Sequence, residues 1–170
     1  MNKLRYGILF YFILNIVIYS QQDTTRGNFW INSAIPPFPE YNGLTLNYSV
    51  NYAIENLAFS LMAFHAEGES TKNKPDFYDL DFFSASVGYR LSYKYLMIAS
   101  FLGTGYTRIS DFHQELKGVK TIGLISNIQI YTYPFTLIGF DGLGFGFELV
   151  SNFNTKHNYN FYHFSVNLNF

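Results

Sequence analysis

The fold of this chain is indicated most clearly by residues 158–170, which read Asn-Tyr-Asn-Phe-Tyr-His-Phe-Ser-Val-Asn-Leu-Asn-Phe. From Tyr162 onward, apolar and polar residues alternate without interruption. The apolar set is Tyr162, Phe164, Val166, Leu168 and Phe170. The polar set is His163, Ser165, Asn167 and Asn169. Successive side chains of a β-strand point to opposite faces of a sheet, so this pattern predicts a strand with one apolar face and one polar face.

A strand of this kind fits two architectures. A soluble barrel of the lipocalin type turns the apolar face inward, around its interior. A membrane barrel turns the apolar face outward, toward lipid. The remaining sequence distinguishes between the two.

Composition limits the classes of function. The 170 residues are 48% hydrophobic, 21% aromatic and only 14% charged, whereas soluble domains carry about 25% charged residues. Cysteine is absent, which excludes disulfides, thiolate metal sites, cysteine nucleophiles and a lipid-modified cysteine. The formal net charge of −1 gives no indication of nucleic-acid binding.

The first twenty residues have the pattern of a secretory signal peptide. Lys3 and Arg5 precede an apolar run over residues 6–19, and the small Ser20 is followed by polar residues. We therefore predict a signal peptide at residues 1–20 and one barrel domain at residues 21–170. A retained membrane helix is the alternative, but it needs about 20 apolar residues, which is more than this run supplies.

Seven further segments alternate in the same way, and a helical period is not convincing in any window beyond the signal region. The predicted strands cover residues 27–35, 44–53, 57–63, 83–91, 95–109, 122–131, 143–152 and 158–170. Short connections favour antiparallel neighbours. In the fifth strand, Leu102 and Tyr106 are expected outside with Leu96 and Ile98, because this choice places the glycines Gly103 and Gly105 inside.

The polar faces of these strands are suited to an interior. They consist of Ser, Asn, Thr, Gln and Gly, whereas a water-facing surface carries interspersed charge. Arg90 and Glu148, the clear charges within strands, both lie on polar faces. Small polar residues also suit the crowded interior of an eight-stranded barrel. The predicted fold class is therefore all-β, an eight-stranded antiparallel up-and-down transmembrane β-barrel.

Connection lengths predict the orientation of this barrel. The connections at residues 36–43, 65–81 and 110–118 are long and polar, and those at 54–56, 93–94 and 133–137 are short. Outer-membrane barrels have short periplasmic turns and longer external loops. Both mature termini are thus expected in the periplasm, and the three long loops are where an extracellular partner would bind. The short connection at 154–157 does not fit this rule.

Aromatic residues near strand ends are expected to form girdles at the membrane interfaces. These residues are Tyr52, Tyr89, Tyr93, Tyr95, Tyr131, Tyr133 and Phe135.

Over residues 27–170 the chain resembles small eight-stranded outer-membrane proteins of the OmpX/OmpA-barrel type. The resemblance rests on the signal peptide, strand count, connection lengths and closing strand. It implies a location in the outer membrane of a Gram-negative cell envelope, in contact with outer-membrane lipid. It also implies that the apolar row from Tyr162 to Phe170 is an assembly signal for the barrel assembly machinery. Proteins of this type include adhesion proteins, structural barrels and a few lipid A-modifying enzymes.

We therefore predict a non-enzymatic structural or surface-interaction role of adhesion-like kind. The alternatives are a lipid A-modifying enzyme and a small passive pore.

One constellation could carry chemistry. His163 and Ser165 share a strand face, and a symmetric hairpin places Glu148 opposite His163. A carboxylate, an imidazole and a hydroxyl could activate a nucleophile, and lipid A deacylase barrels use a similar His-x-Ser pair with a Glu. That family's site faces lipid, however, and the Asn after its Ser is Val166 here. We expect instead a structural polar cluster of Glu148, His163, Ser165 and Arg90 in the lumen, because buried charges need partners.

The other motifs predict no cofactor and no metal site. Gly139, Gly142, Gly144 and Gly146 lack the helix and Lys of a phosphate loop, so they are expected to serve lumen packing. His65, His113 and His157 lie in or beside predicted loops, without paired carboxylate spacing. Residues 65–81 contain five acids and two lysines. Such a stretch is usually a solvated face, and surface recognition or weak divalent-cation binding is the alternative.

Overall fold

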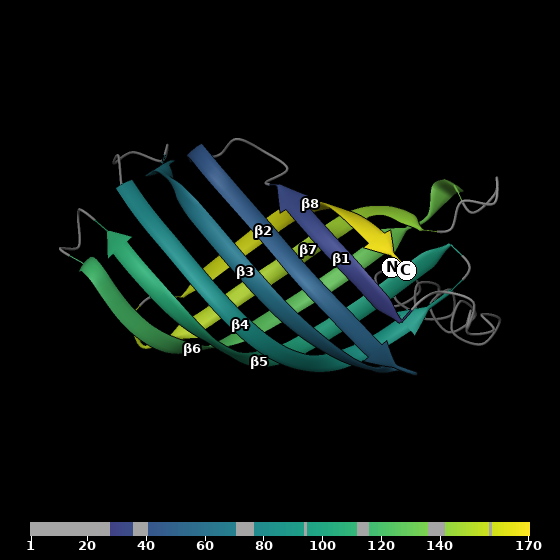
Figure 1. Ribbon diagram of the computed structural model, residues 1–170. Coiled ribbons are helices and arrows are strands. Elements are labelled where there is room, and N and C mark those ends of the chain that lie inside the picture. Colours follow the sequence, from purple (N-terminus) through teal and green to yellow (C-terminus); the bar gives the residue numbers. More distant parts are fainter. Residues whose placement is uncertain are drawn as a thin grey trace, which may run out of the picture.

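The computed structural model in Figure 1 is a closed barrel of eight antiparallel strands, in which each strand pairs with its sequence neighbours and β1 pairs with β8. The structure describes residues 28–35, 41–70, 77–93, 95–111, 116–135, 142–156 and 158–170. The strands are β1 (Phe29–Ile35), β2 (Tyr41–Ile54), β3 (Leu57–Ser70), β4 (Phe77–Ser92), β5 (Leu96–Asp111), β6 (Leu116–Thr132), β7 (Leu143–Asn154) and β8 (Tyr159–Asn169). The predicted fold class and strand count are confirmed. The predicted signal peptide, residues 1–20, lies outside the described residues.

The barrel closes between its first and last strands. In the β1–β8 ladder, Ile31 is opposite Leu168, and the backbone N–H of Phe170 donates to the carbonyl of Phe29 at 2.9 Å. The start of β1 and the end of β8 therefore lie side by side. We call this the terminal end of the barrel. The opposite end, where β1–β2, β3–β4, β5–β6 and β7–β8 connect, is the hairpin end (Figure 1).

Burial alternates along the strands with the predicted polarity. Outward apolar side chains are strongly exposed, including Leu61 at 65%, Ile122 at 73% and Tyr162 at 67%. Inward polar side chains such as Asn47 and Gln129 are buried. In β5, Leu102 and Tyr106 point outward while Gly105 is buried, which confirms the predicted faces. The apolar surface is thus on the outside, as a lipid environment requires, and the lipocalin-like alternative is excluded.

The outward apolar band has the height of an outer-membrane barrel. On β4 it lies between Asp81 and Leu91, which are ten residues apart (91 − 81 = 10). At about 3.3 Å per residue and a tilt of about 40°, the band is about 25 Å tall. Among the described residues, no helix is long and apolar enough to cross a membrane.

The lumen is less polar than the alternation suggests. Two clusters of buried apolar residues fill it, one near each end. The cluster at the terminal end contains Trp30, Ala53, Ala58, Met97, Ala99, Phe101, Tyr131 and Tyr133. The cluster at the hairpin end contains Met62, Phe64, Ala66, Leu80, Phe82, Ile109, Ile125 and Val150. Polar side chains lie between the two clusters.

The prediction that Tyr131 and Tyr133 belong to an interfacial girdle is wrong. Both side chains are fully buried in the lumen, because they continue the inward face that begins with Asn127 and Gln129. Tyr52, Tyr89 and Tyr95, in contrast, are exposed at the terminal end.

Two glycines of β7 allow close contact, Gly146 with the backbone of β6 and Gly144 with the ring of Tyr133. A Cβ atom at Gly146 would lie 1.8 Å from the carbonyl oxygen of Ile130, and one at Gly144 would lie 2.9 Å from the ring of Tyr133. Both glycines are buried. The predicted role in lumen packing is confirmed for Gly144, against which the Tyr133 ring packs, while Gly139 lies outside the described residues.

The predicted long loops need correction, because the strands continue through much of them. β3 extends to Ser70 and β4 begins at Phe77, so most of the predicted loop 65–81 is paired strand. In the same way, β2 begins at Tyr41 within 36–43, and β5 and β6 extend into 110–118. The ladder is made by backbone groups, so polar side chains outside the lipid do not end it.

The predicted short turn at 133–137 is also wrong. The connection between β6 and β7 covers residues 133–142. Connection length alone therefore does not distinguish the two ends of the barrel.

Candidate functional site

The lumen is organised around one buried carboxylate, that of Glu148 on β7, which is 2% exposed. Its register partner on β8 is His163, as the hairpin symmetry predicts. The hydroxyl of Tyr131 donates to Oε1 of Glu148, and Oγ of Ser165 lies 3.1 Å from the same oxygen. Nδ2 of Asn47 donates to Oε2 at 2.7 Å. Hydrogen bonds from three different strands thus satisfy a carboxylate that burial would otherwise destabilise.

Next to this carboxylate, a chain of amides and hydroxyls crosses the inside of β1, β2 and β8. Nδ2 of Asn167 donates to Oδ1 of Asn32 at 2.6 Å, and the amide of Asn32 donates to Oγ of Ser49 at 3.1 Å. The hydroxyl of Tyr133 donates to Oδ1 of Asn167 at 2.8 Å. These bonds tie the closing pair of strands together on the lumen side.

His163 does not join the hydrogen bonds of Glu148. Its ring stacks on Phe161, with centroids 6.0 Å apart and an interplanar angle of 13°, and lies 5.6 Å from the ring of Phe64. Its Nδ1 atom is buried without a hydrogen-bond partner among the described residues. The imidazole therefore packs as an aromatic ring at the edge of the apolar cluster.

Arg90 lies at the terminal end of the lumen, away from the Glu148 hydrogen bonds. Its Nη2 atom donates to Oδ1 of Asn28 at 3.3 Å, and its guanidinium lies 5.1 Å from the centroid of the Trp30 ring. The indole of Trp30 donates in turn to Gln129 at 3.3 Å. The expected cluster of Glu148, His163, Ser165 and Arg90 is thus divided. Ser165 joins Glu148, whereas His163 and Arg90 contact aromatic rings.

Tyr131 and Asn47 are the residues of this site that the sequence reasoning missed. Both lie on inward faces of alternating strands, so the pattern marks them as lumen residues. It gives no sign, however, of which inward side chains meet across the barrel.

The geometry does not assemble a nucleophile. Ser165 is fully buried, and Oγ lies 2.8 Å from the hydroxyl of Tyr131. The imidazole that would act as general base contacts Phe161 and Phe64 instead. A general base must reach the proton that it removes, so the arrangement is that of a packed polar core.

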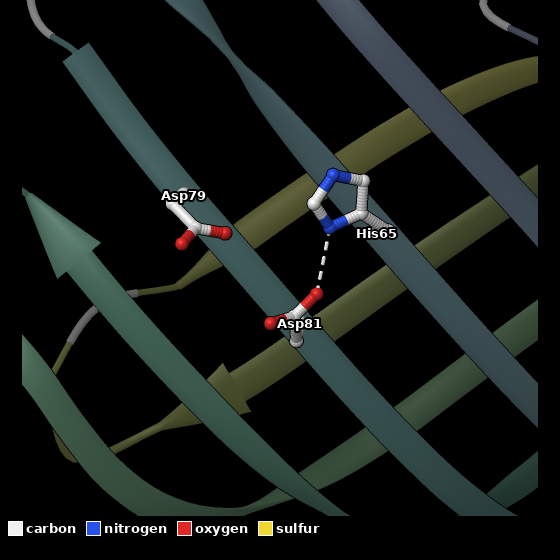
Figure 2. Close-up of side chains that lie close together, drawn as sticks. All are labelled: His65, Asp79 and Asp81. Atoms are coloured by element: carbon white, nitrogen blue, oxygen red, sulfur yellow. Dashed lines mark hydrogen bonds and ion pairs between the residues drawn. The ribbon is translucent and has the colours of Figure 1, made fainter.

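A second cluster lies on the outer face, near the hairpin end. His65 and Glu67 of β3 face Asp81 and Asp79 of β4 in register. Nδ1 of His65 lies 2.7 Å from Oδ1 of Asp81, and Nε2 lies 3.8 Å from Oε2 of Glu67. Figure 2 shows the carboxylates of Asp79 and Asp81 beside the imidazole of His65, above the ribbon of β4 and β3. We call these four residues the outer-face cluster.

The outer-face cluster borders the apolar band. The next outward residues toward the terminal end are Ala63 on β3 and the exposed Phe83 on β4. Across β5 and β6 the same register row continues with Arg108 and Lys120, which are both exposed. Charge on the lipid face costs about 2–4 kcal/mol near the bilayer centre. This charged row therefore marks the edge of the membrane-facing surface.

Comparison with known proteins identifies the fold. No protein-family model and no curated protein sequence matches the chain. The outer membrane protein Ail of Yersinia pestis, in a phospholipid bilayer nanodisc, matches with a TM-score of 0.56 and 13% identity, covering 85% of this chain and 99% of Ail. The N-terminal β-barrel domain of Pseudomonas aeruginosa OprF has a TM-score of 0.56 and 10% identity, covering 86% and 100%. Neisserial surface protein A has a TM-score of 0.51 and 15% identity, covering 85% and 98%.

The class of protein follows from these matches and from the polarity of the two faces. The chain has the fold of small eight-stranded outer-membrane β-barrels, as its sequence resemblance to the OmpX/OmpA-barrel type implies.

The Glu148 network predicts a stability effect. Tyr131→Phe keeps the ring but removes a hydroxyl that donates to Glu148 and contacts Ser165, so the buried carboxylate loses one of its three hydrogen bonds. We expect a loss of about 1–3 kcal/mol in unfolding free energy, measured by urea unfolding in lipid vesicles. Tyr48→Phe is the control, because Tyr48 is exposed on the outer face. Equal stability of the two variants would contradict the role of this network.

Proposed function

We propose that this protein is an integral outer-membrane barrel whose role is surface interaction of adhesion-like kind, without enzymatic activity. The observation that carries the proposal is the distribution of polarity. The barrel has an apolar exterior, and its lumen is filled by two apolar clusters with a hydrogen-bonded polar layer between them. This leaves two surfaces on which a partner can bind. One is the hairpin end, and the other is the outer rim, by which we mean the charged outer face next to that end, where the outer-face cluster lies.

The filled lumen argues against a passive pore. Eight strands leave an interior just wide enough for side chains to fill it. Here Trp30, Phe101 and Tyr131 fill the terminal end, and Phe64 and Phe82 stack at the hairpin end with ring centroids 4.5 Å apart. An ion that passed through the lumen would have to displace these aromatic rings.

The position of Ser165 argues against lipid A modification. A hydroxyl that acts on lipid must reach the outer surface, whereas this one is buried and bonded to neighbours in the lumen. The outward neighbours of Ser165 on β8 are Phe164 and Val166, which offer no nucleophile.

The location and orientation belong to the same proposal. We propose that residues 1–20 are a signal peptide, that residues 21–170 form the barrel, and that both mature termini are periplasmic. The tight turn at Glu55, with a φ of 56°, supports a periplasmic terminal end. The β3–β4 and β5–β6 hairpins continue as charged, paired strand beyond the apolar band. These strand extensions, rather than connection length, support an external hairpin end, because external segments of such barrels project farther from the membrane.

The names of two structural neighbours support the surface role. Ail is the attachment invasion locus protein of Yersinia pestis, and Neisserial surface protein A is named for the cell surface. In this chain the corresponding working surface is the hairpin end, including residues 71–76 and 112–115 with the strand ends beside them. This surface replaces the longer loops 36–43, 65–81 and 110–118 that the sequence predicts.

A loop exchange tests the surface role. Residues 71–76 and 112–115 are replaced by Gly-Ser segments of equal length, and bacteria that display each protein are tested for attachment to cultured cells and matrix proteins. We expect attachment to fall several-fold, because the partner-contacting side chains are removed. The control replaces Glu55 and Asn56, at the terminal end, with Asn-Gly and should attach like wild type.

Three outcomes would contradict the proposal. One is attachment no greater than that of bacteria without the protein. The others are a change in lipid A mass when the protein is expressed and a stable single-channel conductance in planar bilayers.

We also propose that the barrel assembly machinery recognises the outward row of β8, formed by Tyr162, Phe164, Val166, Leu168 and Phe170. Two features support this. The row is apolar and outward, and β8 is the strand that closes the barrel against β1.

This assembly role is tested by Phe170→Ala. We expect less folded protein in the outer membrane of cells, judged by heat-modifiable gel mobility, but a wild-type yield when the purified chain folds into lipid vesicles. Phe147→Ala is a matched control, because Phe147 is exposed to a similar degree (61% against 66%) on the neighbouring strand. If Phe170→Ala assembles like wild type in cells, or fails equally in vesicles, the residue is not an assembly signal.

A further inference from the structure

The outer-face cluster combines ligand types that transition metals prefer. One ligand atom from each of His65, Asp79 and Asp81 lies within 4.8 Å of the other two. Imidazole and carboxylate together suit Zn²⁺ and its neighbours in the first transition series, whereas Ca²⁺ and Mg²⁺ prefer ligand sets made of oxygen alone. The imidazole of His65 therefore favours a transition metal over Ca²⁺ or Mg²⁺.

The β-sheet register holds these ligands in place. Asp79 and Asp81 are two residues apart on β4, so they share the outer face, and His65 is the direct cross-strand partner of Asp81. Each side chain is carried by a paired strand whose backbone the barrel holds rigidly. Zinc ligands lie about 2.0–2.2 Å from the metal, so ligand atoms around a tetrahedral ion are about 3.4 Å apart. The three ligand atoms lie within 4.8 Å of one another, so side-chain rotation without backbone movement would have to close the remaining gap.

The outer-face cluster also has an excess of negative charge, which a bound cation would neutralise. Glu67 of β3 is directly opposite Asp79 of β4, and like charges directly opposite each other destabilise a strand pair. The ion pairs in the described part of this region join His65 to Asp81 and to Glu67. Arg108, the register partner of Asp81 on β5, forms no ion pair with it. A divalent ion would neutralise carboxylates that Arg108, the described basic residue in register with Asp81, does not pair with.

The position of the cluster allows an ion to enter. The side chains of His65 and Asp81 are about one-third exposed, at 35% and 34%, and that of Glu67 is 57% exposed. They lie on the outside of the barrel beyond the apolar band, where water reaches them. Three protein ligands would leave at least one coordination position open.

We propose that His65, Asp79 and Asp81 form a binding site for a divalent first-row transition metal, of which Zn²⁺ is the representative, on the outer rim of the barrel. Glu67 lies beside the site and adds negative charge that attracts the ion. The site is independent of the proposed surface role and of the lumen network.

Calorimetric titration with ZnCl₂ tests the site, using the full barrel folded in maltoside micelles without a histidine tag. We expect saturable binding of one Zn²⁺ per chain. His65→Ala should weaken the affinity at least tenfold, and Asp79→Asn and Asp81→Asn should each weaken it severalfold. Mg²⁺ and Ca²⁺ should bind far more weakly than Zn²⁺. Heat-modifiable mobility verifies that each variant is folded.

The matched control is the double variant His113→Ala/His157→Ala, which removes the two histidines outside the described residues and keeps His65. It should bind Zn²⁺ with wild-type affinity and stoichiometry. The proposal is overturned if His65→Ala binds as tightly as wild type, or if the double variant loses the site instead. Absence of saturable binding, or Mg²⁺ affinity equal to that of Zn²⁺, would also overturn it. If His65→Ala does not fold, the Asp79→Asn and Asp81→Asn variants provide the test. Zn²⁺ affinity equal to that of wild type in both variants would then overturn the proposal.

Discussion

The structure depends on the pairing of β1 with β8. In lipid, a backbone N–H or C=O without a partner costs several kcal/mol, so a sheet that crosses a membrane must leave no open edge. Here the ladder from Ile35 and Phe164 to the Phe170–Phe29 hydrogen bond joins the first strand to the last. Once the sheet is closed, alternation assigns every second side chain to lipid. The lumen receives the remaining side chains and must pack them.

The contents of the lumen follow from this assignment. Glu148 is the inward carboxylate of β7, and it is compatible with burial because Tyr131, Ser165 and Asn47 donate to it from three other strands. Aromatic and aliphatic clusters fill the space on either side. A lumen packed in this way stabilises the barrel but offers neither a channel nor an accessible nucleophile. Binding chemistry is consequently confined to the hairpin end and the outer rim, where the outer-face cluster lies.

Period-2 alternation was sufficient to predict the strand count. The composition of the polar faces added the lipid-facing side, and the symmetry of the last hairpin added the pairing of Glu148 with His163. Alternation was insufficient for strand ends, because backbone pairing continues past Phe64 and before Phe82 through polar residues that resemble a loop. It also misplaced Tyr131, since tyrosine suits both a membrane interface and a lumen that contains an acceptor. The pairing of His65 with Asp81 was missed for a related reason. Cross-strand neighbours can be read from a sequence only when the turn between the strands is located correctly.

The side chains of β8 alternate between lipid and a packed lumen, and this alternation can be measured directly. Because the chain contains no cysteine, a nitroxide can be attached to single cysteines introduced one at a time from residue 162 to residue 168, in protein folded into lipid vesicles. Collision rates with oxygen, which concentrates in lipid, report the environment of each label. We expect high oxygen accessibility at 162, 164, 166 and 168 and low accessibility at 163, 165 and 167. A uniform profile, or the opposite alternation with the lumen positions more accessible, would contradict this arrangement.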